Sequence, residues 1–132
     1  MINKSLYDKS FYESTHSHVY SAQKIFEIIF KHLKPRSIID IGCGSGSWLK
    51  AASEMGVKNL TGIEGNWLKP EMLIVENINL LIHDISSSLP RLSKYDLAIT
   101  LEVAEHLSES RSKSFIEDLC GLSDVVLFSA AI

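Results

Sequence analysis

The sequence has few cysteines, no long apolar run and no excess of positive charge. Its 132 residues include only two cysteines, Cys43 and Cys120, and carry a net charge of −3. Two distant cysteines make no disulfide framework, so we expect reduced thiols in a cytoplasmic protein. No apolar run reaches the roughly 18 residues of a membrane span, and the polar first residues do not resemble a signal peptide. The charge gives no strong sign of nucleic-acid binding.

The sequence does contain alternating apolar segments of strand and helix type. Its 45% hydrophobic and 22% charged residues are typical of one globular domain. Residues 1–20 form a polar lead-in, and residues 21–132 form the predicted domain. Apolar residues at helical spacing predict helices at 21–34, 47–55 and 110–120, with a helical turn at 70–73. Short β-branched runs predict strands at 37–41, 59–64, 79–83, 96–101 and 125–130.

This alternation predicts an α/β fold built on a doubly wound parallel sheet with helices on both faces. Right-handed crossovers favour the strand order 3-2-1-4-5. Ligands of such sheets bind at the carboxyl ends of the strands, where the winding reverses. We therefore expect the functional crevice at the ends of strands 37–41 and 96–101.

The strand at 37–41 runs directly into a glycine-rich turn. Gly42, Gly44 and Gly46 occupy every second position, and Asp40 stands two residues before the first of them. Glycines let the backbone approach a ligand closely, and the helix that follows points free N–H groups at it. A carboxylate at Asp40 would repel a pyrophosphate in a low-dielectric crevice. The pattern therefore favours a ligand with a cationic end over a dinucleotide.

The run from Asp40 to Gly46 resembles motif I of the class I S-adenosylmethionine-dependent methyltransferases, an acid followed by any residue and Gly-x-Gly-x-Gly. The resemblance implies a Rossmann-like fold that binds S-adenosylmethionine and releases S-adenosylhomocysteine. It further implies that Asp40 supports the loop and the methionine amino group. Gly42, Cys43 and Gly44 are then the loop residues that contact the cofactor.

Two further acids follow expected strands. Glu64, with Gly65 after it, lies about 20 residues beyond the glycine loop, where an acid can accept both ribose hydroxyls. It matches the motif II acid of the same family. Asp84 resembles the residue that accepts the adenine N6 amino group, while the N–H of Ile85 meets ring N1. The alternatives are a solvated acid at Glu64 and a turn-capping role for Asp84.

The segment from Tyr95 to Leu107 resembles motif IV, in which the backbone of Leu101 and Glu102 lines the methionine end of the cofactor. Glu102, Glu105 and His106 are spaced i, i+3 and i+4, which predicts one face of a helix. One interpretation is a polar cofactor wall with His106 as the catalytic base. A second is a hard-metal site, because small-RNA 2′-O-methyltransferases use the same spacing for metal ligands. The third is a structural helix start. We favour the first and assign no metal ligand.

Aromatic and histidine side chains elsewhere are candidates for the edge of the crevice. Trp48 and Trp67 are candidates to border the cofactor, although packing of the helix on the sheet is the stronger expectation for Trp48. The lead-in either folds over the crevice as a lid or frays. Its candidate lid residues are Tyr12, His16, His18 and Tyr20.

The sequence ends within or just after its fifth expected strand, whereas class I methyltransferases normally have seven. We interpret the chain as a fragment, and the open edge of strand 125–130 predicts a two-fold homodimer. The predicted function is methyl transfer to an unidentified O, N or C nucleophile, achieved mainly by proximity and orientation. The 132-residue form is not necessarily active. The alternatives are a non-catalytic S-adenosylmethionine-binding module and an NAD-dependent oxidoreductase, and the glycine spacing argues against the latter.

Overall fold

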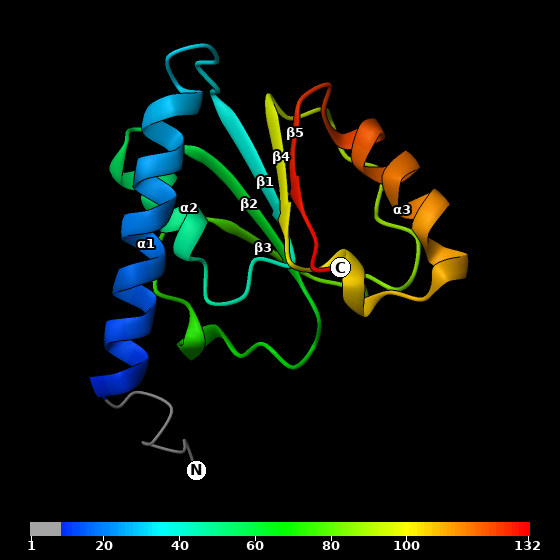
Figure 1. Ribbon diagram of the computed structural model, residues 1–132, viewed down its shortest axis with the longest axis horizontal. Helices are drawn as coiled ribbons and strands as arrows, with labels where there is room; N and C mark the ends of the chain where they lie inside the picture. Colours follow the sequence, from blue (N-terminus) through cyan, green and yellow to red (C-terminus); the bar gives the residue numbers. More distant parts are fainter. Residues whose placement is uncertain (1–8) are drawn as a thin grey trace.

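The computed structural model describes the chain from Lys9 to Ile132, and its side chains from Ser14 onward. Five parallel strands form one sheet in the order β3-β2-β1-β4-β5 (Figure 1). The predicted doubly wound sheet and its strand order are confirmed. The strands are β1 (Ser37–Ile41), β2 (Asn59–Glu64), β3 (Asn79–Ile82), β4 (Leu97–Leu101) and β5 (Val126–Ser129).

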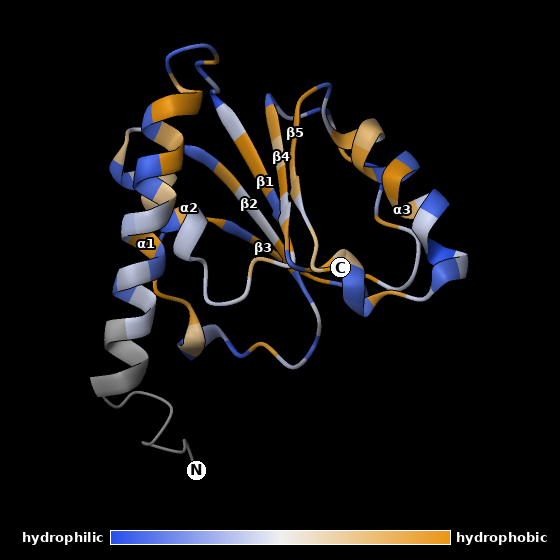
Figure 2. Ribbon diagram, in the orientation of Figure 1, coloured by the Kyte–Doolittle hydropathy of each residue, from blue (hydrophilic) through white to orange (hydrophobic). Residues whose placement is uncertain are grey.

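Helices cover both faces of the sheet, which gives three layers (Figure 1). α1 (Lys9–Ile29) and α2 (Ser47–Glu54) lie on one face, and α3 (Glu109–Leu122) lies on the other. Successive strand residues point to opposite faces. Ile38 accordingly joins the apolar cluster under α1 and α2, whereas Ile39 and Ile41 join the cluster under α3. Figure 2 shows that many residues along the strands are hydrophobic.

Two helices differ in extent from the sequence prediction. α1 begins at Lys9 rather than at residue 21, and it ends at Ile29 rather than at residue 34. Thr15 and Val19 are buried one helical turn apart, so the core-facing stripe extends into the segment that looks polar in the sequence. α3 continues through Gly121 to Leu122, because the buried Leu122 side chain keeps the last turn on the sheet. Among the helices of the described part of the chain, none combines the length and apolarity needed to cross a bilayer.

Candidate functional site

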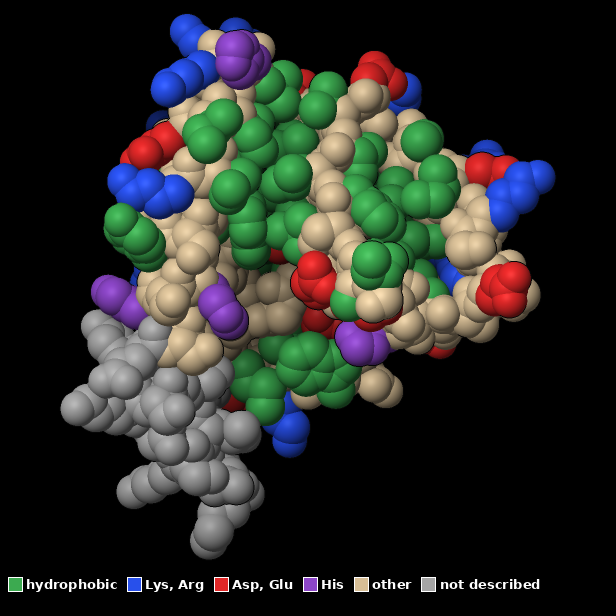
Figure 3. Space-filling view, viewed as in Figure 1, with side chains coloured by type: hydrophobic (Ala, Val, Ile, Leu, Met, Phe, Trp, Pro, Cys, Tyr) green, Lys and Arg blue, Asp and Glu red, His purple; other side chains and the backbone are tan. Residues whose placement is uncertain are grey.

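A pocket of about 420 Å³ lies at the carboxyl ends of the strands, beside the point where the winding reverses between β1 and β4. In Figure 3, acidic and histidine side chains gather around a hollow at this end of the molecule. Eight of the residues selected from the sequence line the pocket: Gly42, Glu64, Gly65, Asp84, Ile85, Leu101, Glu102 and His106. The candidate Trp67 also lines it, together with three residues that were not predicted from the sequence, Ser86, Val103 and Leu107.

Glu64 connects the glycine loop to the end of β2. Its Oε2 accepts a hydrogen bond from the Gly44 N–H at 3.0 Å, and its Oε1 accepts one from the Gly65 N–H at 2.8 Å. The Trp67 indole N–H donates to the same Oε1 at 3.0 Å. The side chain is buried, and hydrogen bonds to a carboxylate are stronger than neutral ones. Glu64 is therefore held in one orientation at the wall of the pocket.

The glycine loop requires glycine where it packs most closely. Gly42 has a φ of 81°, and a Cβ there would overlap the Val103 side chain. Gly46 has a φ of 89° and precedes α2 in a left-handed conformation, with Val75 2.7 Å from the position of a Cβ. An L-residue with a side chain is strained at such φ values. The loop can therefore lie directly against the 73–75 and 102–103 segments.

Asp40 lies behind the loop and does not line the pocket. Its side chain is 4% exposed. Burial raises the pKa of Asp40 to about 7, and the nearby Glu64 charge contributes to the same shift. Burial also raises the pKa of the Cys43 thiol, with contributions from the Asp40 and Glu64 charges. Ionisation of Asp40 therefore carries a desolvation cost, which a nearby positive charge or hydrogen-bond donor would offset.

Asp84 and Ile85 form a tight turn after β3. Asp84 Oδ1 accepts hydrogen bonds from the Ser86 N–H at 3.0 Å and the Ser86 hydroxyl at 2.6 Å. These bonds lower the pKa of Asp84, the hydroxyl contributing most. The Ser87 N–H donates to the Asp84 carbonyl oxygen at 3.0 Å. The turn-capping role considered for Asp84 is therefore present, and Asp84 still lines the pocket through the same turn.

The prediction that Glu102, Glu105 and His106 share a helix face is wrong. Glu102 has a φ of 56° directly after β4, and only Ala104–His106 form a turn of 3₁₀ helix. The Glu102 N–H donates to the Ser129 carbonyl oxygen at 3.0 Å, so the chain follows β5 for one more residue before it turns. Glu102 and His106 line the pocket, and Glu105 does not. Among the described residues, no group of three His, Cys, Asp or Glu side chains is placed to hold a metal ion.

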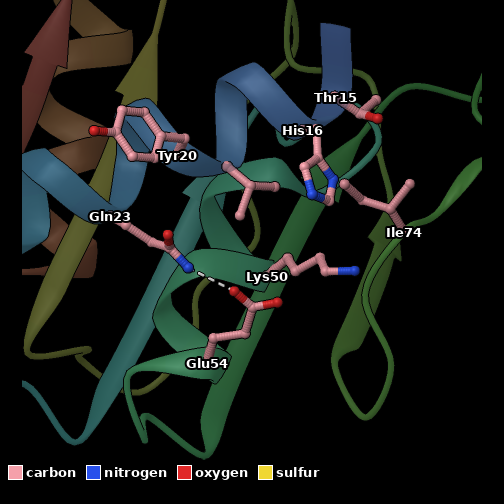
Figure 4. A pocket seen from close by; sticks show the side chains of 8 residues that line it. Thr15, His16, Tyr20, Gln23, Lys50, Glu54 and Ile74 are labelled. Carbon is pink, nitrogen blue, oxygen red and sulfur yellow. Dashed lines mark hydrogen bonds between the residues drawn. The ribbon is translucent and has the colours of Figure 1, made fainter. Parts of the chain in front are cut away.

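A second pocket, of about 320 Å³, lies between α1 and α2 (Figure 4). A Gln23 side chain donates to Glu54 at 2.6 Å across it, and Lys50 lies beside Ile74. His16 and Tyr20, two of the four candidate lid residues, line this pocket instead of the crevice. The Tyr12 side chain lies outside the described residues. Trp48 packs edge-to-face on Phe26 at 5.3 Å, as expected for a core position.

Comparisons with known proteins agree with this arrangement. A family model described as a methyltransferase domain matches residues 12–119. The sphingolipid C9-methyltransferase of Candida albicans is 32% identical over 92 residues, covering 61% of this chain and 18% of that protein. The methyltransferase domain of bacterial CtHen1 is 26% identical with a TM-score of 0.57, covering 74% of this chain and 56% of that one.

A further structure shares the fold alone. CalS10, an amino pentose methyltransferase from Micromonospora echinaspora solved with bound SAM, gives a TM-score of 0.67 at 17% identity. The match covers 86% of this chain and 51% of that one. The chain thus spans about half the length of these two solved proteins and less than a fifth of the Candida protein.

Proposed function

This chain belongs to the methyltransferase-domain family and has the Rossmann-like fold of the class I enzymes, and we propose that its crevice binds S-adenosylmethionine for methyl transfer. One observation carries the proposal. Glu64 and Leu101 end β2 and β4, Asp84 lies in the turn after β3, and all three line a single pocket with Gly42 of the glycine loop. Carboxylates and bare backbone at one rim suit a ligand with ribose hydroxyls, an amino-bearing base and a cationic end.

Each part of the cofactor has a partner in this proposal. Glu64, held by the Gly44 and Gly65 N–H groups, accepts the ribose hydroxyls with the remaining lone pairs of its carboxylate. Asp84 accepts from the adenine N6 amino group, and the Ile85 N–H donates to ring N1. The backbone at Leu101 and Glu102 lines the methionine end. The remaining proposed cofactor residues are Asp40, Cys43, Gly44 and Gly65. Asp40 supports the glycine loop and the methionine amino group.

His106 is the proposed catalytic base. Its side chain lies at the pocket, is 79% exposed, and has Nε2 3.9 Å from Glu105 Oε1. The acceptor nucleophile attacks the sulfonium methyl in line, the C–S bond breaks, and S-adenosylhomocysteine leaves with the sulfur electron pair. The methyl acceptor is an unidentified O, N or C nucleophile.

Calorimetric titration with S-adenosylhomocysteine tests the cofactor site. The wild-type chain should bind, and Glu64→Gln should weaken binding about 100-fold, because two charge-assisted hydrogen bonds to the ribose are lost. Glu117→Gln, an exposed acid on α3, is the matched control and should bind like wild type. Absence of binding by folded wild-type protein, or equal affinity in the Glu64 variant, would contradict the proposal.

Two alternative functions can be distinguished with the same wild-type protein, by ligand titration and a methyl-transfer assay. A non-catalytic S-adenosylmethionine-binding module would bind the cofactor and transfer no methyl group to any acceptor. An NAD-dependent oxidoreductase would bind NAD in the titration, and the family match to residues 12–119 speaks against it.

We also propose that the chain forms a two-fold homodimer through β5. β5 is an edge strand of the described sheet, and Phe128 within it and Val125 directly before it are each 43% exposed. In Figure 3 hydrophobic side chains cover much of the surface around this strand. An apolar, unpaired edge favours strand pairing between molecules.

The unpaired Cys43 and Cys120 support the further proposal of a cytoplasmic location.

A further inference from the structure

Arg111 of α3 is a buried cation that holds the loop after β3. Only 7% of the residue is exposed. Its Nη2 donates to the Ser87 carbonyl oxygen at 2.8 Å, and its Nε donates to the Ile85 carbonyl oxygen at 3.4 Å. Nη2 also donates to Asp118 Oδ2 at 2.7 Å, and the same oxygen accepts the Leu89 N–H at 3.0 Å. One guanidinium and its counter-ion therefore fix three backbone groups of the 85–89 loop.

The same guanidinium is itself held in place. Nη1 donates to the Ser114 hydroxyl at 2.7 Å, and the guanidinium carbon lies 5.4 Å from the centre of the Phe115 ring. Phe115 is fully buried under the sheet. The planar fork of arginine can serve several acceptors at once, which a lysine ammonium on a flexible stem cannot do in the same geometry. The rigidity of α3 is thus transmitted to the loop through this side chain.

The turn at the start of the loop that Arg111 holds carries the two groups proposed to bind adenine, the Asp84 carboxylate and the Ile85 N–H. Asp84 Oδ1 is occupied by Ser86, which leaves Oδ2 for a ligand. The Ile85 carbonyl, and not its N–H, faces Arg111. Among the described residues, none accepts a hydrogen bond from the Ile85 N–H. The Ile85 N–H shares its peptide plane with the Asp84 carbonyl, which accepts the Ser87 N–H at 3.0 Å. Because Arg111 holds the carbonyl of Ser87, it restricts the turn that sets the direction of the Ile85 N–H.

We propose that Arg111 is a positioning residue for base recognition, which sets the spacing between the Asp84 carboxylate and the Ile85 N–H. This inference rests on the proposed function. Adenine presents a donor at N6 and an acceptor at N1, which complement these two groups. Hypoxanthine presents an acceptor and a donor at the same positions, so both contacts become repulsive. A fixed loop enforces that difference, whereas a loop free to shift accommodates either base.

The test compares S-adenosylhomocysteine with S-inosylhomocysteine in wild type, Arg111→Lys and Arg111→Met. Wild type should prefer the adenosyl ligand by at least about 100-fold, because hypoxanthine places an acceptor against the Asp84 carboxylate and a donor against the Ile85 N–H. Arg111→Lys keeps a positive charge near Asp118, and the preference should still fall about tenfold. Lys113→Met on the same helix, whose side chain is 90% exposed, is the matched control and should keep the full preference.

Hydrogen exchange of the 85–89 amides, measured without ligand, provides the second readout. Exchange should be faster in both Arg111 variants than in wild type and Lys113→Met. If the variants lose thermal stability but keep both the base preference and slow exchange, Arg111 is merely structural and the inference fails. If wild type binds neither ligand, the proposed function fails first, and the base-recognition role of Arg111 is overturned with it.

Discussion

Asp40 is a carboxyl group that the folded chain keeps mostly neutral below pH 7. Its pKa is raised from 3.8 to about 7, chiefly by burial and secondly by the Glu64 charge. Between these two pH values the folded state binds the proton that the unfolded state has released. The free energy of unfolding therefore contains a contribution that is present below about pH 4 and is lost as the pH rises to 7. A shift of this size corresponds to about 4 kcal/mol.

Asp40→Asn should remove the free-energy cost of ionising this buried carboxyl group. At pH 8 the variant should be more stable than wild type by up to about 4 kcal/mol, and at pH 4 the two should be nearly equal. Urea unfolding at several pH values measures the difference. Asp124→Asn, which alters an exposed ion pair with Lys94, is the control and should show no such pH dependence. A difference between Asp40→Asn and wild type that stays constant from pH 4 to 8 would contradict the assignment.

Individual residues show where the sequence was sufficient and where it was not. Glu64 ends β2 and Asp84 comes shortly after β3, so their position at one rim is a consequence of parallel topology alone. The burial of Asp40 behind the loop depends on how the 42–46 backbone folds over it, which spacing does not reveal. The hydrogen bond from Trp67 to Glu64 depends on the path of an irregular loop, and no pattern in the sequence predicts it.

The glycine loop is the element on which the crevice depends most. Gly42→Ala should destabilise the chain by about 2–4 kcal/mol, because the left-handed φ strains an L-residue and the new Cβ overlaps Val103. Gly56→Ala is a matched control, with a φ of 95° and no atom within 4 Å of its Cβ position. It should lose only the conformational part, about 1–2 kcal/mol. Guanidinium unfolding measures both losses.

A second substitution separates the two contributions at Gly42. Val103→Ala in the Gly42→Ala background removes the side chain that the Cβ meets, and it should restore part of the lost stability. Equal losses in Gly42→Ala and Gly56→Ala, or no recovery in the double variant, would show that the close contact with Val103 has no energetic importance.

Among the elements, strands were predicted better than helix ends. A β-branched run flanked by turn residues defines each strand to within a residue or two, whereas α1 extends into a segment that looks polar in the sequence but buries Thr15 and Val19. The prediction for the segment after β4 was wrong for a different reason. The Glu102 N–H pairs with Ser129 of β5, a contact between residues far apart in the sequence, and the chain then turns with a positive φ at Glu102. Helical spacing alone therefore predicted the wrong local structure there.

The arrangement of the whole molecule follows from few rules. Right-handed crossovers and one reversal of winding give the strand order and place the crevice beside β1 and β4. The two apolar clusters on opposite faces of the sheet fix the register, since a slip of one residue would exchange Ile38 with Ile39. The partner of the outer edge of β5 does not follow from these rules, because any strand can supply the missing hydrogen bonds.

The backbone of β5 indicates which substitution tests pairing at that edge. The Val125 and Ser129 carbonyl oxygens accept hydrogen bonds from the β4 side, from Ala98 and Glu102. Residues of a strand alternate in the direction of their backbone groups. The N–H of Phe128 therefore points away from β4, toward the open edge. A proline at this position removes an N–H that β4 does not use, and proline is tolerated on edge strands.

Phe128→Pro should abolish the proposed homodimer while the fold is retained, and Phe128→Ala is its matched control. Both variants remove the 43% exposed aromatic ring, but the alanine keeps the outward N–H. Sedimentation equilibrium over a range of concentrations should show a monomer for the proline variant and weakened dimerisation for the alanine variant. Circular dichroism should show unchanged secondary structure in both. A wild-type chain that is monomeric at all concentrations, or a proline variant that dimerises as well as the alanine variant, would show that β5 does not pair between molecules.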